Sequence, residues 1–167
     1  MDCHAVTLGW RPVRHARGNI PWPEVYDTNK LITGARLDRP LVVDVGGSKG
    51  HDLEKFHQKH PDIPQGTLVL QDLPEVLNSL TVDPAISICP HDSFASQPIK
   101  GAGAYYFHLV LHDWPDDRAA EILGNTADAM EPRILQDPAL RGRRKCAKVL
   151  YPSHYPGHNY DDVFLVL

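Results

Sequence analysis

Hydrophobic runs alternate with amphipathic segments between residues 40 and 132. Short runs rich in aliphatic and β-branched residues, bounded by glycine, proline or polar residues, predict buried strands at 41–45, 67–70, 85–89 and 104–111. Helical spacing of apolar residues predicts helices at 51–60, from 73 onward, and from Asp116 or Asp117 to Met130. A chain that alternates strands and helices in this way folds as an open sheet covered on both faces. We therefore expect an α/β domain with a doubly wound, mostly parallel sheet.

The two ends of the chain lack such a pattern. Residues 1–39 hold scattered prolines and glycines, and they predict an irregular lead-in with one short helix near 24–33. Beyond Pro132, a basic cluster is followed by a stretch rich in tyrosine, proline, histidine and glycine, and then by an apolar end at 163–167. The sequence thus predicts three segments: a lead-in at 1–39, a domain at 40–132 and a divergent, poorly packed tail at 133–167.

The composition argues against several classes of function. Hydrophobic residues make up 42% and charged residues 23% of the chain, as in globular proteins. The net charge of −4 argues against a nucleic-acid partner, and no run approaches the ~20 apolar residues of a membrane span. Three cysteines, Cys3, Cys89 and Cys146, lie far apart and favour neither disulfides nor a zinc site. We expect a cytoplasmic protein without a signal peptide, a metal site, or a nucleic-acid or membrane partner.

A glycine turn follows the first predicted strand. Gly46, Gly47 and Gly50 lie between that strand and the next predicted helix. Such a turn lets a ligand approach the backbone, and the helix that follows offers unpaired N–H groups. The spacing is not the G-x-G-x-x-G pattern of dinucleotide-binding proteins, which disfavours a nicotinamide dehydrogenase. A tight connection between strand and helix would explain the glycines equally well.

Aspartates accompany each of the first three predicted strands. Asp44 precedes the glycine turn, Asp72 ends the second strand, and Asp92 follows the third strand together with Phe94. At the carboxyl edge of a parallel sheet, an acid such as Asp72 can accept hydrogen bonds from both hydroxyls of a ribose. Three carboxylates suit a cationic or hydroxyl-rich ligand better than a pyrophosphate. Each aspartate could instead cap a helix or stabilise a turn.

Three segments, in this order, resemble the signature segments of one enzyme family. They are residues 41–53 (LVVDVGGSKGHDL), 69–77 (VLQDLPEVL) and 104–117 (AYYFHLVLHDWPDD). The chain resembles the S-adenosylmethionine-dependent O-methyltransferases of the caffeate and fungal secondary-metabolite type over roughly residues 40–132, and HDWPDD is the most specific element. The resemblance implies a Rossmann-like class I methyltransferase fold, and methyl transfer from S-adenosylmethionine to a hydroxyl of a small phenolic or polyketide-like molecule.

The resemblance also implies roles for residues of the cofactor site. In the family, the glycine turn wraps the methionine part of the cofactor, one acid binds the ribose, and a second acid and its neighbour lie at the adenine. A further position, four residues before the catalytic histidine, is often lysine in plant members. The matching residues here are Asp44, Gly46 and Gly47 at the turn, Asp72 at the ribose, Asp92 and Phe94 at the adenine, and His108 at the further position.

His112 matches the catalytic histidine of the family. A phenol with a pKa of ~10 is a poor nucleophile near neutral pH, and a histidine with a pKa of ~6.5 can remove its proton as the methyl group is transferred. The resemblance therefore implies that His112 is the general base. A structural histidine at a strand end is the alternative interpretation of this residue.

The chain departs from the family pattern after Pro132. Family members are about twice as long and usually form homodimers through an N-terminal helical domain, which we do not find here. Their catalytic domain continues into a strand that ends in a glutamate, which orients the catalytic histidine, but no glutamate follows Glu131 in this chain. We therefore expect a sheet that is incomplete at its C-terminal end, with an exposed apolar edge. The alternative function is a catalytically impaired remnant that binds the cofactor or acts as an interaction protein.

Overall fold

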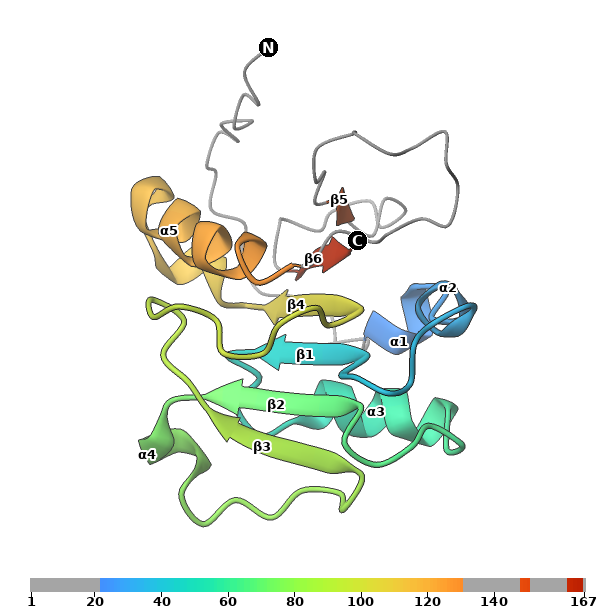
Figure 1. Ribbon diagram of the computed structural model, residues 1–167. Helices are drawn as coiled ribbons and strands as arrows, with labels where there is room; N and C mark the ends of the chain where they lie inside the picture. Colours follow the sequence, from blue (N-terminus) through green and yellow to red (C-terminus); the bar gives the residue numbers. More distant parts are fainter. Residues whose placement is uncertain (1–21, 131–147, 151–161, 167) are drawn as a thin grey trace, which may run out of the picture.

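The computed structural model describes residues 22–130, 148–150 and 162–166 (Figure 1). Its helices are α1 (Trp22–Val25), α2 (Asn29–Ile32), α3 (His51–Lys59), α4 (Pro74–Leu77), the short 3-10 helix η1 (Leu111–Asp113) and α5 (Asp116–Ala127). Its strands are β1 (Val42–Val45), β2 (Leu68–Asp72), β3 (Ile86–Pro90), β4 (Ala104–His108), β5 (Lys148–Leu150) and β6 (Asp162–Val166). These strands form one sheet in the order β3-β2-β1-β4-β6-β5.

The first four strands are parallel. β1 lies between β2 and β4, with Val43 opposite Val69 on one side and opposite Tyr105 on the other, and β3 pairs with the outer side of β2. Their carboxyl ends therefore lie at one edge of the sheet, at the left of Figure 1. The strand order reverses between β1 and β4, and open α/β sheets bind ligands at such a point, beyond the carboxyl ends of the strands. The predicted α/β, Rossmann-like fold is confirmed.

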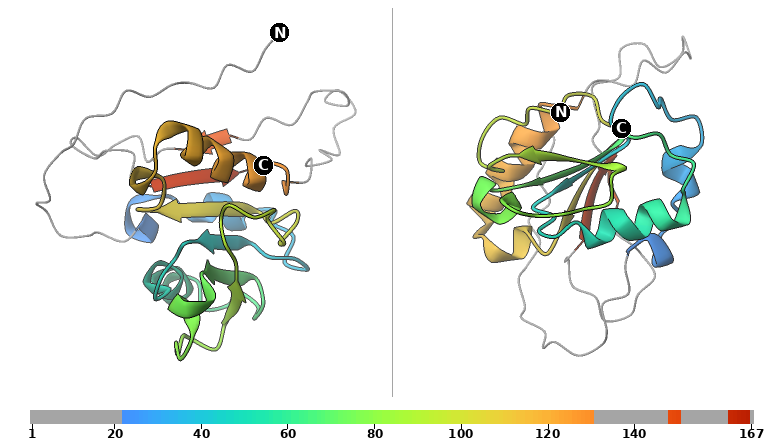
Figure 2. Two further views of the ribbon diagram at one scale, coloured as in Figure 1. Left: turned by 90° about the vertical axis from the view of Figure 1, so that its left-hand side faces the viewer. Right: turned by 90° about the horizontal axis from the view of Figure 1, so that it is seen from below.

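Helices cover both faces of the sheet (Figure 2). Alternate strand residues point to opposite faces, so Val42 and Tyr106 pack in one core cluster and Val43 and Tyr105 in another. α3 contributes Leu53 and Phe56 to the first cluster, and α5 contributes Ile122 to the second. β1, β2 and β4 are buried on both faces over nearly their whole length, which explains why their sequences are mostly apolar rather than alternating.

Several element ends differ from the prediction. The fourth strand, expected at 104–111, ends at His108, because Leu109 has a φ of 55° and turns the chain out of the sheet. The helix expected near 24–33 is two short helices, α1 and α2, and α5 ends at Ala127 rather than at Met130. Between α1 and α2, Thr28 is fully buried and its hydroxyl is hydrogen-bonded to His60 Nε2 at 2.7 Å.

Part of the C-terminal segment joins the sheet. β6 pairs antiparallel with β4, with Ala104 opposite Val166 and His108 opposite Asp162, and β5 pairs antiparallel with β6. The expectation of a poorly packed tail that leaves an apolar edge on β4 is therefore wrong for 162–166. The run of Val, Phe and Leu in this segment favours a strand, and its backbone groups satisfy the open side of β4. Apart from β5 and β6, the predicted tail lies outside the described residues.

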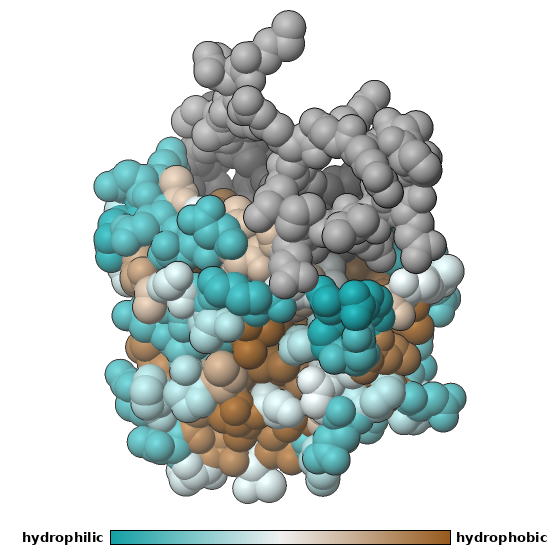
Figure 3. Space-filling model, in the orientation of Figure 1, coloured by the Kyte–Doolittle hydropathy of each residue, from teal (hydrophilic) through white to brown (hydrophobic). Residues whose placement is uncertain are grey.

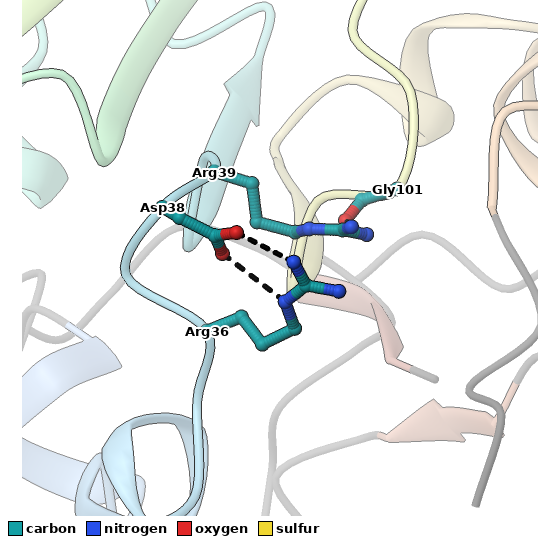
Figure 4. Close-up of polar contacts among 4 residues, drawn as sticks. All are labelled: Arg36, Asp38, Arg39 and Gly101. Atoms are coloured by element: carbon teal, nitrogen blue, oxygen red, sulfur yellow. Dashed lines mark hydrogen bonds and ion pairs between the residues drawn. The ribbon is translucent and has the colours of Figure 1, made fainter.

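Two hydrogen bonds link the chain just before β1 to the chain just before β4. Arg39 Nη1, which lies beside Gly101 in Figure 4, donates to the Gly101 carbonyl at 3.2 Å. The Gly103 N–H donates to the Pro40 carbonyl at 3.0 Å. The neighbouring ion pair between Arg36 and Asp38 lowers the pKa of Asp38, chiefly through the hydrogen bonds between the two side chains. Both side chains are exposed, so this pair contributes little to stability.

The edge formed by β3 leaves apolar side chains exposed. Figure 3 shows hydrophobic surface among polar residues over the part of the sheet formed by β2 and β3. Ile88 on β3 is 40% exposed. Leu73, just before α4, and Val76, within α4, are exposed to a similar extent. Within the described residues, no helix has the length and apolar character needed to cross a membrane.

Candidate functional site

The turn between β1 and α3 requires glycine at two positions. Gly46 has a φ of 75°, and a Cβ at this residue would lie 2.6 Å from Cγ2 of Val110. A Cβ at Gly47 would lie 2.5 Å from Cγ of Asp44. The N–H groups of both glycines donate to the carbonyl of Gln71 at the end of β2, at 2.8 and 3.0 Å. The turn is thus tied to β2 from one side and closed over by the loop after β4.

Asp44 lies beneath this turn. Only 1% of the residue is exposed, and its carboxylate is packed directly under Gly47. A side chain at position 47 would collide with this carboxylate, so the close packing of Asp44 under the turn depends on glycine there. The position of Asp44 therefore indicates that it supports the turn from below.

Asp72 is held at the end of β2 by two backbone donors. Its Oδ2 accepts the Ser48 N–H at 2.8 Å, and its Oδ1 accepts the Leu73 N–H at 2.7 Å. Ser48 belongs to the glycine turn and has a φ of 51°. A carboxylate can accept about four hydrogen bonds, so acceptor capacity remains beyond these two. The side chain is half-buried, which leaves it accessible from the carboxyl edge of the sheet.

Asp92 and Phe94 lie on the loop after β3. Asp92 accepts the N–H of Phe94 on Oδ1 at 2.9 Å and the N–H of Ala95 on its carbonyl at 2.8 Å, which fixes a tight turn. The Phe94 ring contacts Trp114 edge to face at 4.7 Å between ring centroids, and the Arg118 guanidinium lies 3.9 Å from its centroid. The structure therefore brings the loop after β3 against the segment that follows η1.

His108 stands at the carboxyl end of β4 and faces α3. Its Nδ1 is 2.6 Å from Oδ2 of Asp52, in the first turn of α3, and both side chains are partly buried. Asp52 lies two residues beyond Gly50, where the glycine turn ends. The pair thus joins the end of β4 to the far side of the glycine turn, and the sequence analysis missed Asp52 because its partner is 56 residues away.

His112 lies in η1, four residues beyond the end of β4. The side chain is 43% exposed, and Nε2 is 3.1 Å from Oδ1 of Asp113. In the described part of the chain, Asp113 is the carboxylate that stands beside this imidazole. The loop that carries His112 is anchored to the glycine turn, because Val110 packs against Gly46.

Of the residues predicted for the site, Gly46, Gly47 and Asp72 form one unit: the two glycines are hydrogen-bonded to Gln71 in β2, and Asp72 accepts the N–H of Ser48 in the turn. Phe94 and Asp92 form a second unit, and His108 and His112 stand on the segment after β4, which touches the first unit through Val110. All lie at the carboxyl edge, as expected, although Asp44 is buried below it. Sequence reasoning also missed Arg118, because a residue on the exposed face of a helix gives no signal of the ring it covers.

Comparison with known proteins identifies the family. A family model described as the O-methyltransferase domain matches residues 12–135, well over half of the chain. The chain belongs to the O-methyltransferase family. The family predicted from the three sequence segments is thus confirmed, and the match includes the glycine turn, Asp72, Asp92 and the segment with His112.

Fungal members of the O-methyltransferase family are close relatives. O-methyltransferase ATR12 of Stachybotrys chlorohalonatus is 49% identical over 115 residues, which cover 69% of this chain and 29% of that protein. O-methyltransferase asqD of Emericella nidulans is 48% identical over 116 residues, covering 66% of this chain and 30% of that protein. The chain therefore matches about a third of the length of these relatives.

Solved structures share the fold. A structure of LepI in complex with S-adenosylmethionine is 36% identical, with a TM-score of 0.58, over 64% of this chain and 28% of that one. OxaC in complex with S-adenosylhomocysteine and oxaline is 29% identical, with a TM-score of 0.58, over 66% of this chain and 29% of that one. A further structure, 36% identical with a TM-score of 0.58 over 64% of this chain and 28% of that one, is described as a pericyclic reaction enzyme.

Proposed function

We propose that this protein binds S-adenosylmethionine at the carboxyl edge of its sheet. The observation that carries the proposal is the Asp72 carboxylate, held by the N–H groups of Ser48 and Leu73 beside a turn that only glycine can form. A fixed carboxylate with spare acceptor capacity fits the two hydroxyls of a ribose. The bound cofactor or its product in the LepI and OxaC structures supports the same ligand here.

The remaining residues are assigned around Asp72. The methionine part of the ligand would lie against the backbone of Gly46 and Gly47. Asp44 would support these two glycines from below. Asp92 and Phe94 would lie at the adenine, where the fixed turn presents the Asp92 carboxylate and the Phe94 ring. His108, paired with Asp52, would border the same site at the end of β4.

We propose that the reaction is methyl transfer to a hydroxyl of a small aromatic or polyketide-like molecule. Bound S-adenosylmethionine supplies an electrophilic methyl group. An imidazole nitrogen of His112 would accept the proton of the attacking hydroxyl, which is possible because the side chain is open to solvent. Val110 places the loop of His112 against the turn that would hold the methionine part, so base and cofactor would be positioned by one contact.

The proposed partner is a small molecule. Oxaline in the OxaC structure is an example of such a ligand in a similar protein. The net charge of −4 agrees with a small-molecule rather than a nucleic-acid partner. We also infer a cytoplasmic location from the scattered cysteines.

One similar structure is described as a pericyclic reaction enzyme, so a protein of this fold can have an activity other than methyl transfer. The test therefore measures cofactor binding and methyl transfer separately. Titration calorimetry with S-adenosylmethionine, S-adenosylhomocysteine and NAD measures binding. Incubation with methyl-labelled cofactor and a panel of catechols and polyketide phenols measures transfer. We expect binding of the first two ligands, no binding of NAD, and labelled product. Binding without label in any product would favour the catalytically impaired alternative, and binding of NAD alone would overturn the proposal.

A further inference from the structure

Two buried amide side chains pair with each other beneath the carboxyl edge of the sheet. Gln71 Nε2 donates to Gln97 Oε1 at 2.8 Å, and Gln97 Nε2 donates to Gln71 Oε1 at 2.9 Å. Gln71 is fully buried, and Gln97 is 1% exposed. Gln97 Oε1 also accepts the Ile99 N–H at 3.1 Å, and Gln71 Nε2 is 3.6 Å from the sulfur of Cys89. The pair is therefore closed to water and satisfied within the protein.

This pair links both halves of the proposed cofactor site. The backbone carbonyl of Gln71 accepts the N–H groups of Gly46 and Gly47, so the residue fixes the turn assigned to the methionine part. Gln97 belongs to the loop after β3 that carries Asp92 and Phe94. Two other hydrogen bonds hold the same loop: the His91 N–H to the carbonyl of Asp72, at 2.8 Å, and Asn125 Nδ2 to the carbonyl of Phe94, at 2.9 Å.

We propose that Gln97 is a positioning residue for the nucleoside half of the cofactor site. Its paired amide holds the Asp92–Phe94 turn at a fixed distance from the end of β2, where Asp72 stands. This inference rests on the proposed binding of S-adenosylmethionine and adds to it a residue that would not touch the ligand.

Directional pairing explains why amides occupy a place that apolar side chains could fill. Two apolar residues of equal volume would bury the same surface. The loop after β3 could then occupy several positions of similar energy. Two reciprocal hydrogen bonds permit one relative placement. Loss of one partner leaves the other amide buried and unpaired, whereas replacement of both removes that cost. Stability and positioning can therefore be separated by mutation.

The experiment uses the full chain with S-adenosylhomocysteine as the probe. The variants are Gln97→Met, the double variant Gln71→Met/Gln97→Met, and the control Thr67→Val. Thr67 is a buried polar residue at the opposite end of β2, where its hydroxyl donates to the Pro64 carbonyl at 2.6 Å. Each protein is measured by denaturant unfolding, by calorimetric titration and by hydrogen exchange of the backbone N–H groups of residues 92–97 and 99.

We expect Gln97→Met to weaken the affinity for S-adenosylhomocysteine about tenfold, within the usual range of coupling between residues in contact. The double variant should regain stability yet bind as weakly as the single variant, and Thr67→Val should lose stability but bind like the wild type. A return of affinity together with stability would show a purely structural role and overturn the proposal, as would unchanged affinity in Gln97→Met.

Hydrogen exchange separates this proposal from the proposed function. If the wild-type chain does not bind S-adenosylhomocysteine, the proposed function fails, and exchange alone decides the role of Gln97. Faster exchange at residues 92–97 and 99 in both glutamine variants, but not in Thr67→Val, would support the positioning role. Exchange equal to the wild type would refute it.

Discussion

Val110 packs against Gly46, and the two residues could not be so close if position 46 carried a side chain. A Cβ there would lie 2.6 Å from Cγ2 of Val110. The contact joins the loop that carries His112 to the turn between β1 and α3. In the proposed mechanism, the general base and the methionine part of the cofactor are thus positioned across one van der Waals contact rather than through separate parts of the fold.

Gly46→Ala is expected to destabilise the protein and to disturb the site. The φ of 75° is unfavourable for alanine, and the stiff β-branched side chain of Val110 cannot rotate away freely. We expect a loss of about 1–3 kcal/mol in the free energy of unfolding, the usual scale of such backbone strain. Denaturant unfolding measures it. The variant Gly46→Ala/Val110→Ala should relieve the clash between the new Cβ and the Val110 side chain, but not the backbone strain at residue 46. Equal stability of the single and double variants would contradict the contact between residues 46 and 110.

Asp72→Ala is expected to weaken S-adenosylmethionine binding by about 1.5–3 kcal/mol, the scale of hydrogen bonds to a charged group. The reason is that Asp72 would bind the ribose and also fixes Ser48 of the glycine turn. Calorimetric titration provides the measurement. Asp62→Ala, at an exposed aspartate beyond α3, is the matched control and should bind like the wild type. An unchanged dissociation constant for Asp72→Ala would remove this residue from the site.

His112→Gln is expected to abolish methyl transfer and leave cofactor affinity within a few tenths of a kcal/mol, since a general base contributes ~10²–10⁴-fold to rate. Transfer of a labelled methyl group and calorimetric titration measure the two effects. We expect transfer by the chain itself to be slow, because in the described residues the carboxylate beside His112 is the exposed Asp113 and not a buried orienting group. Transfer that survives His112→Gln would refute the assignment of the base.

β1, β2 and β4 could be predicted because they are buried on both faces and are therefore mostly apolar, as at Val42–Val45. The position of Asp72 could be predicted as well, because it depends only on where β2 ends. Gln97 and Asp52 could not, since each acts through a partner 26 or 56 residues away. β6 was missed for a similar reason: its pairing with β4 is a long-range contact, and the irregular sequence around it gives no local sign of the partner. Local patterns thus indicate elements and edges, whereas tertiary pairing selects the supporting residues.

His60 is expected to make the stability of the protein depend on pH. Burial lowers the pKa of His60 below its ordinary value, and the charge of Lys59 lowers it further. The folded state therefore binds fewer protons than the unfolded state, so stability is complete above the unfolded pKa of ~6.5 and declines as the pH falls toward the lower folded pKa.

His60→Gln keeps a polar partner for Thr28 but cannot titrate. Denaturant unfolding between pH 5 and pH 8 (about the range in which histidine titrates) should show a smaller loss of stability on acidification in this variant than in the wild type. Gln58→Asn, an exposed neutral substitution in α3 two residues before His60, should keep the wild-type slope. Equal slopes in His60→Gln and the wild type would show that burial of His60 does not disfavour the charged imidazole.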